Sequence, residues 1–133
     1  MITRNVLGKM MVLSRMMQTM RAAKQGERIV VVSNYTQTLD LIQAMCDQSG
    51  YPVLRLDGTV TATRRTKIVD EFNAPHSGAF VFLLSSKAGG CGINLIGGNR
   101  YVLYYPNSAD EHWVIYILFL LHDYCRISAV IYT

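Results

Sequence analysis

The sequence predicts an α/β fold built on a doubly wound, mostly parallel sheet. Two patterns lead to this prediction. Short runs of β-branched and other apolar residues alternate along the chain with segments in which apolar residues recur at helical spacing. Polar or glycine-containing segments also follow the apolar runs, as at turns from a strand into a helix. Strands that alternate with helices form parallel βαβ units with right-handed crossovers, so helices should cover both faces of one sheet.

A long helix is predicted before the first strand. From Val6 to Met20 an apolar side chain recurs at every third or fourth position, which forms one face of an amphipathic helix ending near Gly26. A methionine-rich face of this kind can be a partner surface, but a stripe facing the core is the more common explanation.

Four segments are predicted as strands: residues 29–33, 52–56, 79–84 and 100–104. The first is an almost continuous β-branched run, which is typical of a strand buried on both faces. After residue 106 the regular alternation of strands and helices fades.

Two further helices are predicted between these strands. Thr36 or Thr38 should cap the first of them, and Gly50 should end it. Thr61 should cap the second. The apolar face of the first is predicted to be Leu39, Ile42 and Met45 or Cys46.

The composition fits one globular, intracellular domain. Half of the 133 residues are apolar and 17% are charged, which argues against a disordered chain. The charge is uneven, because residues 1–67 hold ten lysines and arginines against four acids, whereas residues 68–133 hold three against five. A basic half suits a polyanionic partner, although on charge alone a solvated basic surface is the favoured explanation.

The chain carries no catalytic or metal-binding signature. Its three cysteines are widely spaced and are interpreted as reduced thiols, and its three histidines form no triad or zinc pattern. We therefore predict no catalytic residue and no metal ligand. The apolar run 113–121 is shorter than the roughly 20 residues of a membrane span, so it is predicted to be a buried helix or strand, with no membrane association.

Polar segments follow three of the predicted strands, at residues 33–35, 57–59 and 85–90. In an open parallel sheet ligands bind outside the carboxyl ends of the strands, so these segments should meet along one edge. They carry hydroxyls, amides and Lys87, which are groups that contact a phosphate backbone. Each segment alone is best explained as an ordinary loop, whereas all three on one edge favour binding.

Residues 82–95 combine an apolar strand, a glycine-rich turn and a predicted short helix. Glycine lets backbone approach a ligand closely, and a helix amino terminus offers amides to an anion. The predicted ligand is a nucleotide, a nucleic-acid backbone or both. Gly8-Lys9 is not part of a Walker A pattern. The basic residues within 64–67 could also contact phosphates, but a solvated helix face explains them equally well.

Four segments resemble the second RecA-like lobe of the Swi/Snf-type DNA translocases of helicase superfamily two. The likeness is to the recombination-repair branch, the Rad-fifty-four-like proteins. Residues 8–10 resemble the start of that lobe, residues 30–40 its motif IV, residues 51–59 the next block, and residues 83–100 motif V with the strand after it. The resemblance covers residues 8–104.

The resemblance implies a lobe of an ATP-driven translocase on duplex DNA, in homologous-recombination DNA repair and chromatin remodelling. In such proteins two RecA-like lobes close on ATP, and loops of the second lobe hold the DNA backbone. The residues it implies for DNA binding are Ser33, Asn34, Gly58, Thr59, Ser85, Ser86 and Lys87. The residues it implies for the ATP cleft are Gly89, Gly90, Gly92 and Asn94.

The chain departs from the family pattern after the fourth predicted strand. Tyr105 stands where the family has the first acid of an Asp-Pro-Asp-Trp-Asn-Pro segment, and no arginine-rich motif VI follows. The arginine finger and the Walker A lobe are therefore both missing from this sequence. We expect residues 1–106 to form a partial helicase C-terminal lobe, and residues 107–133 to form a divergent, irregular apolar tail.

These departures predict that ATP and Mg bind only when the chain is paired with a first lobe, and that the chain alone does not hydrolyse ATP. The expected partners are duplex DNA, a first RecA-like lobe and, from the resemblance, a strand-exchange recombinase, all in the nucleus. Two alternatives stay open. One is a non-catalytic module that binds nucleic acid or a partner, and the other is a non-functional truncated gene product.

Overall fold

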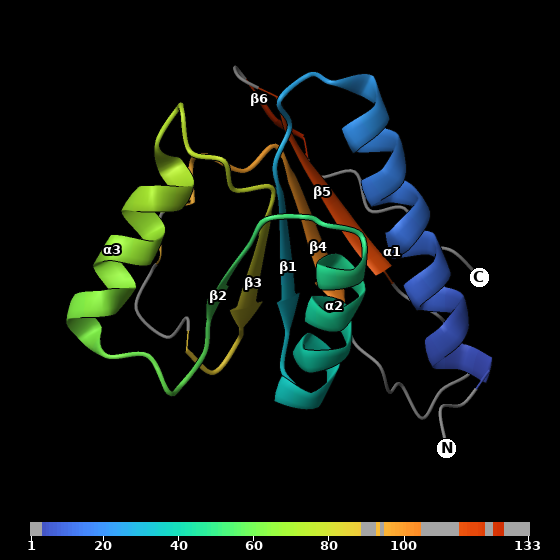
Figure 1. Cartoon of the computed structure of the whole chain (residues 1–133), viewed down its shortest axis with the longest axis horizontal. Helices are drawn as coiled ribbons and strands as arrows, with labels where there is room; N and C mark the ends of the chain where they lie inside the picture. Colours follow the sequence, from blue (N-terminus) through green and yellow to red (C-terminus); the bar gives the residue numbers. More distant parts are fainter. Residues whose placement is uncertain (1–3, 89–92, 94, 105–114, 122–123, 127–133) are drawn as a thin grey trace.

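The computed structural model describes residues 4–88, 93, 95–104, 115–121 and 124–126. Helices and strands alternate up to β3, as the sequence predicts, and the next three described elements are the strands β4, β5 and β6 (Figure 1). The elements are α1 (Arg4–Ala23), β1 (Ile29–Ser33), α2 (Thr36–Gln48), β2 (Val53–Leu56), α3 (Ala62–Asn73), β3 (Val81–Ser85), β4 (Arg100–Tyr104), β5 (Ile115–Leu121) and β6 (Tyr124–Arg126).

The strands form one sheet in the order β2-β3-β1-β4-β5-β6. β1 lies between β3 and β4 and pairs in parallel with both, while β2 pairs in parallel with β3. Figure 1 shows α1 and α2 on one side of the sheet and α3 on the other. This part of the molecule is the doubly wound parallel sheet that the sequence predicts.

The first face of the sheet buries the apolar stripe of α1 and the apolar face of α2. The stripe of α1 thus faces the core, and Cys46 rather than Met45 completes the buried face of α2. Alternate residues of β1, β3 and β4 meet these helices because side chains in a strand point to opposite faces in turn. The buried residues of this core are Leu13, Met17, Met20, Ile29, Val31, Leu39, Ile42, Cys46, Phe80, Val81, Leu83, Val102 and Tyr104.

The second face of the sheet is covered by α3 together with the segment that leads into β4. The apolar core on this face has fewer buried residues than the core on the first face. Phe72 of α3 meets Phe82 of β3 edge to face, with ring centroids 5.0 Å apart. Such an aromatic pair typically contributes about 0.5–1.5 kcal/mol beyond the area that it buries. The buried residues of this core are Val30, Leu56, Phe72, Phe82 and Leu95.

Arg28 lies at the amino end of β1 and fastens α3 to the sheet. Its guanidinium group donates hydrogen bonds to the carbonyl oxygens of Phe72, Pro75 (3.1 Å) and Ser77 (3.5 Å). These carbonyls belong to the last turn of α3 and the loop after it, where a cation also complements the negative end of the helix dipole. The side chain is buried, so its many partners offset the cost of removing its charge from water.

The ends of α2 and the start of α3 agree only in part with the expectations from the sequence. The N-cap of α2 is Tyr35, whose side chain makes no capping hydrogen bond, so the prediction of Thr36 or Thr38 was wrong. Thr36 is already the first helical residue, because only two residues separate the end of β1 at Ser33 from the start of α2. The caps at Thr61 and the end of α2 near Gly50 are confirmed, and Gly50 has a φ of 70°.

The short helix predicted after the glycine-rich turn falls mainly on residues outside the described part of the chain. Within the expected apolar tail, residues 115–121 form β5, which decides between the helix and the strand left open by the sequence. β5 pairs antiparallel with β4, and β6 pairs antiparallel with β5, so regular strands occupy part of a tail expected to be irregular. The boundary at residue 106 stays a prediction. No helix of the described residues is long and apolar enough to cross a membrane.

We expect Gly97→Ala to lower the free energy of unfolding by about 1–3 kcal/mol, because backbone must move to admit the methyl group. A Cβ atom at Gly97 would lie 2.6 Å from the carbonyl oxygen of Phe72 and 2.9 Å from the Cα of Asn73. Urea denaturation measures the change. Gly78→Ala is the control, because a Cβ atom there meets nothing within 4 Å. Equal stability of the two variants would contradict the close approach.

Candidate nucleic-acid interface

The carboxyl ends of β1, β2 and β3 lie level at one edge of the sheet. Ser33 pairs in register with Ser85, and Leu56 pairs with Leu84. The backbone N–H of Ser86 donates to the carbonyl oxygen of Ser33 over 3.0 Å, which joins the loop after β3 to the end of β1. The expected meeting of the three polar segments along one edge is therefore confirmed for their described residues.

Ser33 and Ser85 lie inside this edge rather than on its surface. Their exposed fractions are 1% and 2%, and the Ser33 hydroxyl oxygen accepts a hydrogen bond from the N–H of Tyr35 over 3.4 Å. A buried polar side chain needs such an internal partner. In this conformation Ser33 shapes the start of α2. The contact of both serines with DNA stays a prediction.

Ser86 and Lys87 are exposed in the turn that follows β3. The N–H of Ala88 donates to the carbonyl oxygen of Ser85 over 3.0 Å, and the buried methyl group of Ala88 anchors the turn. The edge therefore presents one hydroxyl and one ammonium group on a short, anchored turn. Both groups donate hydrogen bonds to phosphate oxygens in other proteins.

Asn34 follows β1 and is half-buried. Its Oδ1 atom is buried and has no hydrogen-bond partner among the described residues. An orphaned carbonyl oxygen of this kind is uncommon in folded proteins and requires a donor. A phosphate oxygen cannot supply one, so only the NH2 group of Asn34 is suited to a phosphate contact.

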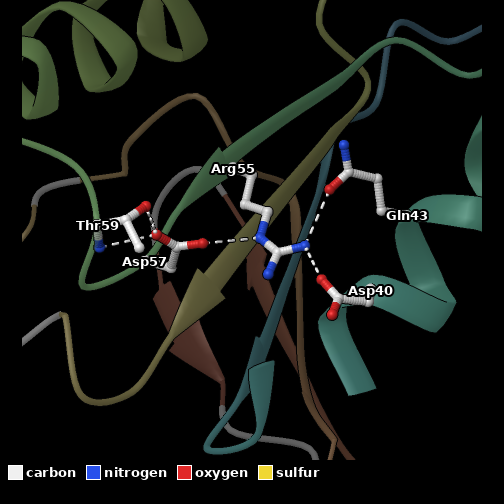
Figure 2. Close-up of polar contacts among 5 residues, drawn as sticks. All are labelled: Asp40, Gln43, Arg55, Asp57 and Thr59. Carbon is white, nitrogen blue, oxygen red and sulfur yellow. Dashed lines mark hydrogen bonds and ion pairs between the residues drawn. The ribbon is translucent and has the colours of Figure 1, made fainter. Parts of the chain in front are cut away.

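Arg55 of β2 joins two elements at the same edge (Figure 2). Its Nε donates to Asp57 Oδ2 over 3.0 Å, and its Nη1 donates to Asp40 Oδ1 over 2.6 Å and Gln43 Oε1 over 3.0 Å. Asp40 and Gln43 belong to α2, whereas Asp57 begins the turn after β2. The arginine side chain is only 20% exposed.

Asp57 holds the turn that carries Gly58 and Thr59. Its Oδ1 accepts from the N–H of Thr59 over 3.0 Å and from the Thr59 hydroxyl over 2.6 Å. These hydrogen bonds, with a smaller contribution from Arg55, hold the pKa of Asp57 below its usual value. Gly58 and Thr59 are both exposed, but the two donor groups of Thr59 are already engaged by Asp57.

The role of Arg55 and its partners on α2 was not predicted from the sequence. Asp40 and Gln43 lie 15 and 12 residues from Arg55, so only the packing of α2 beside β2 brings them together. Their spacing of three residues on one helical face was the one available signal, and it is weak.

α3 begins close to this turn and carries further basic groups. The Thr61 hydroxyl accepts from the N–H of Arg64 over 3.4 Å and caps the helix. Arg64 and Lys67 are exposed, while Arg65 is half-buried. Their contact with phosphates stays a prediction.

The residues expected at an ATP cleft, Gly89, Gly90, Gly92 and Asn94, lie outside the described residues. Among the residues that the structure does describe, no group of three or more histidine, cysteine or acidic side chains could hold a metal ion. Cys46 is buried between α1 and α2, and burial, with a smaller effect of Asp47, raises its pKa to about 11. Its thiol is therefore protonated at neutral pH.

The chain is similar to known proteins over most of its length. The helicase conserved C-terminal domain family matches residues 8–116. DNA repair protein rhp54 of Schizosaccharomyces pombe is 53% identical over 113 residues, which cover 83% of this chain and 13% of that protein. The human DNA repair and recombination protein RAD54-like is 51% identical over 100 residues, which cover 75% of this chain and 13% of that protein.

A solved structure shows the same likeness. The crystal structure of the C-terminal part of the Fun30 ATPase domain superposes with a TM-score of 0.62 at 34% identity, over 69% of this chain and 29% of that one. The chain thus spans a small part of the proteins that it matches. Its sequence is similar to those of Rad54-type DNA repair proteins and its fold to that of the C-terminal part of the Fun30 ATPase domain, and the chain belongs to the helicase conserved C-terminal domain family.

Proposed function

We propose that this chain holds the sugar–phosphate backbone of duplex DNA at the carboxyl edge of β1, β2 and β3. The observation that carries the proposal is the exposed Ser86-Lys87 turn, which a backbone hydrogen bond fixes to the end of β1. A lysine on a fixed turn supplies the charge that phosphate binding requires, and the hydroxyl beside it supplies direction. Two similar proteins, rhp54 and the human RAD54-like protein, are named for DNA repair or for repair and recombination, which supports the same ligand.

Within this proposal the groups at the edge have different roles. Lys87, Ser86 and the exposed backbone of Gly58 are the groups suited to direct contact. Ser33 and Ser85, which are buried, act by shaping the two loops. The hydroxyl and the N–H of Thr59 both donate hydrogen bonds to Asp57. A DNA contact through either group would therefore require that hydrogen bond to break.

We further propose that the chain serves as the second RecA-like lobe of an ATP-dependent DNA translocase in recombination repair and chromatin remodelling. ATP and Mg would bind only when a first lobe supplies a Walker A loop and the magnesium-binding acids. The proposed partners are duplex DNA, that first lobe and a strand-exchange recombinase, in the nucleus. A non-catalytic role as a DNA-binding or partner-binding module needs only the edge described above.

We expect Lys87→Gln to weaken duplex-DNA binding by about fivefold, as the loss of about 1 kcal/mol from an exposed charge pair would do. The slope of log K against log salt concentration should also fall by about 0.9, because one fewer phosphate is neutralised. Fluorescence anisotropy at several salt concentrations measures both quantities.

The matched control is Lys24→Gln. Lys24 is also an exposed lysine, but it precedes β1 and so lies toward the opposite edge of the sheet. Equal losses in the two variants would show nonspecific attraction to a basic surface. A folded parent chain that binds no DNA would refute the proposed function and direct the search to a partner lobe.

The purified chain should release no phosphate from ATP, with or without DNA. Its sequence has neither a Walker A loop nor a motif VI arginine, and both act directly on the transferring phosphate. A coupled phosphate-release assay tests this expectation. DNA-stimulated release that disappears in Lys87→Ala or Asn94→Ala would overturn it.

A further inference from the structure

We propose that Arg55 is a positioning residue, which fixes the turn after β2 relative to the loop after β1. Its importance for DNA rests on the function proposed above, because both segments belong to the proposed DNA edge. Arg55 is not proposed to touch DNA itself. It acts through Asp57 on one side and through Asp40 and Gln43 on the other (Figure 2).

Two nitrogens of the Arg55 guanidinium group donate hydrogen bonds in different directions. Nε faces Asp57, and Nη1 faces the two acceptors on α2. A planar guanidinium group can donate in both directions at once, whereas the single ammonium group of lysine cannot keep both sets of contacts. The chemistry of this position is therefore specific to arginine and does not depend on positive charge alone.

The Asp57 arm is the more sheltered one. The side chains of Arg55 and Asp57 are 20% and 13% exposed, whereas that of Asp40 is 65% exposed. Water and salt screen an exposed pair strongly, so the contact with Asp57 should contribute more than the contact with Asp40.

Asp57 transmits this restraint to Thr59. Oδ2 of Asp57 accepts a hydrogen bond from Arg55, and Oδ1 accepts hydrogen bonds from both the N–H and the hydroxyl of Thr59. Hydrogen bonds therefore hold the carboxylate through both of its oxygens, and they restrain the turn before any ligand arrives. A loop that is already ordered loses less conformational entropy on binding.

The second arm reaches the neighbouring loop. α2 begins at Thr36, directly after the loop that contains Asn34, and Asp40 and Gln43 are its fifth and eighth residues. By holding both α2 and the turn after β2, Arg55 sets the distance between two of the proposed DNA segments. Phosphates recur along a DNA strand at a regular spacing, so contacts at both segments require that distance to be kept.

The charges around Arg55 distinguish this role from a direct contact. The positive charge of Arg55 is already balanced by Asp40 and Asp57 at 2.6 and 3.0 Å. Losing Arg55 should therefore leave the number of neutralised DNA phosphates unchanged. A direct phosphate contact would instead reduce the salt slope by about 0.9.

The test compares duplex-DNA binding by the purified full chain and by Arg55→Lys across a range of salt concentrations. We expect binding about fivefold weaker, the cost of ordering a loop that is no longer held, with the salt slope unchanged. In Arg55→Gln, which also removes the charge, a fall in slope of about one unit would identify Arg55 as a direct contact and overturn the proposal. Unchanged affinity would overturn it as well.

Arg100→Lys is the matched control. Arg100 is also a half-buried arginine, and it pairs with Glu27 over 3.0 Å at the amino edge of the sheet. Thermal melting of both variants reports any general loss of stability. Equal losses of DNA affinity in the two variants would mean that an arginine contact supports the fold as a whole, and the positioning role would be refuted.

A second measurement does not depend on DNA. NMR can follow the exchange of the Thr59 amide proton and the titration of the Asp57 carboxyl group in the free chain. In Arg55→Lys the amide should exchange faster, and the pKa of Asp57 should rise toward its usual value. If neither changes, the positioning role fails. If both change but the parent binds no DNA, Arg55 orders the turn and the proposed function fails instead.

Discussion

The parallel pairing of β1 with β3 is the constraint on which the proposed site depends. Because Ser33 and Ser85 are in register, the two strands end together and the N–H of Ser86 reaches the carbonyl oxygen of Ser33. A slip of one residue would exchange the side chains that β1 gives to the two cores and would move Ser33 out of line with Ser85. The same register that buries the core therefore aligns the loops at the edge.

Two arginines connect the helices to this sheet at opposite ends. Arg28 binds the last turn of α3 and its loop near the start of β1, while Arg55 binds the first turns of α2 near the end of β2. Each uses several donors of one guanidinium group, which makes them stronger and more directional than single exposed ion pairs. The first arginine supports the smaller core, and the second supports the candidate site.

The carboxyl edge separates groups that shape it from groups that face solvent. The side chains of Ser33 and Ser85 are buried, and the carboxylate of Asp57 accepts hydrogen bonds from other residues of the chain. Ser86 and Lys87 are exposed. A surface arranged in this way places few donors toward a ligand and holds them on ordered loops. Phosphates recur at a regular spacing along a DNA strand, so contacts with them require groups that are held at defined positions.

The sequence by itself determined the parallel strands, the three helices and the loops that follow the strands, because periodicity and glycine or threonine signals act over a few residues. It also pointed to the family through the segments around Val30, Arg55 and Ser85. Only the tertiary structure decided that Tyr35 precedes α2, that residues 115–121 are a strand, that Ser33 and Ser85 are buried, and that Arg55 meets Asp40. These outcomes depend on which elements pack together across the sheet, and no local pattern in the chain encodes that choice.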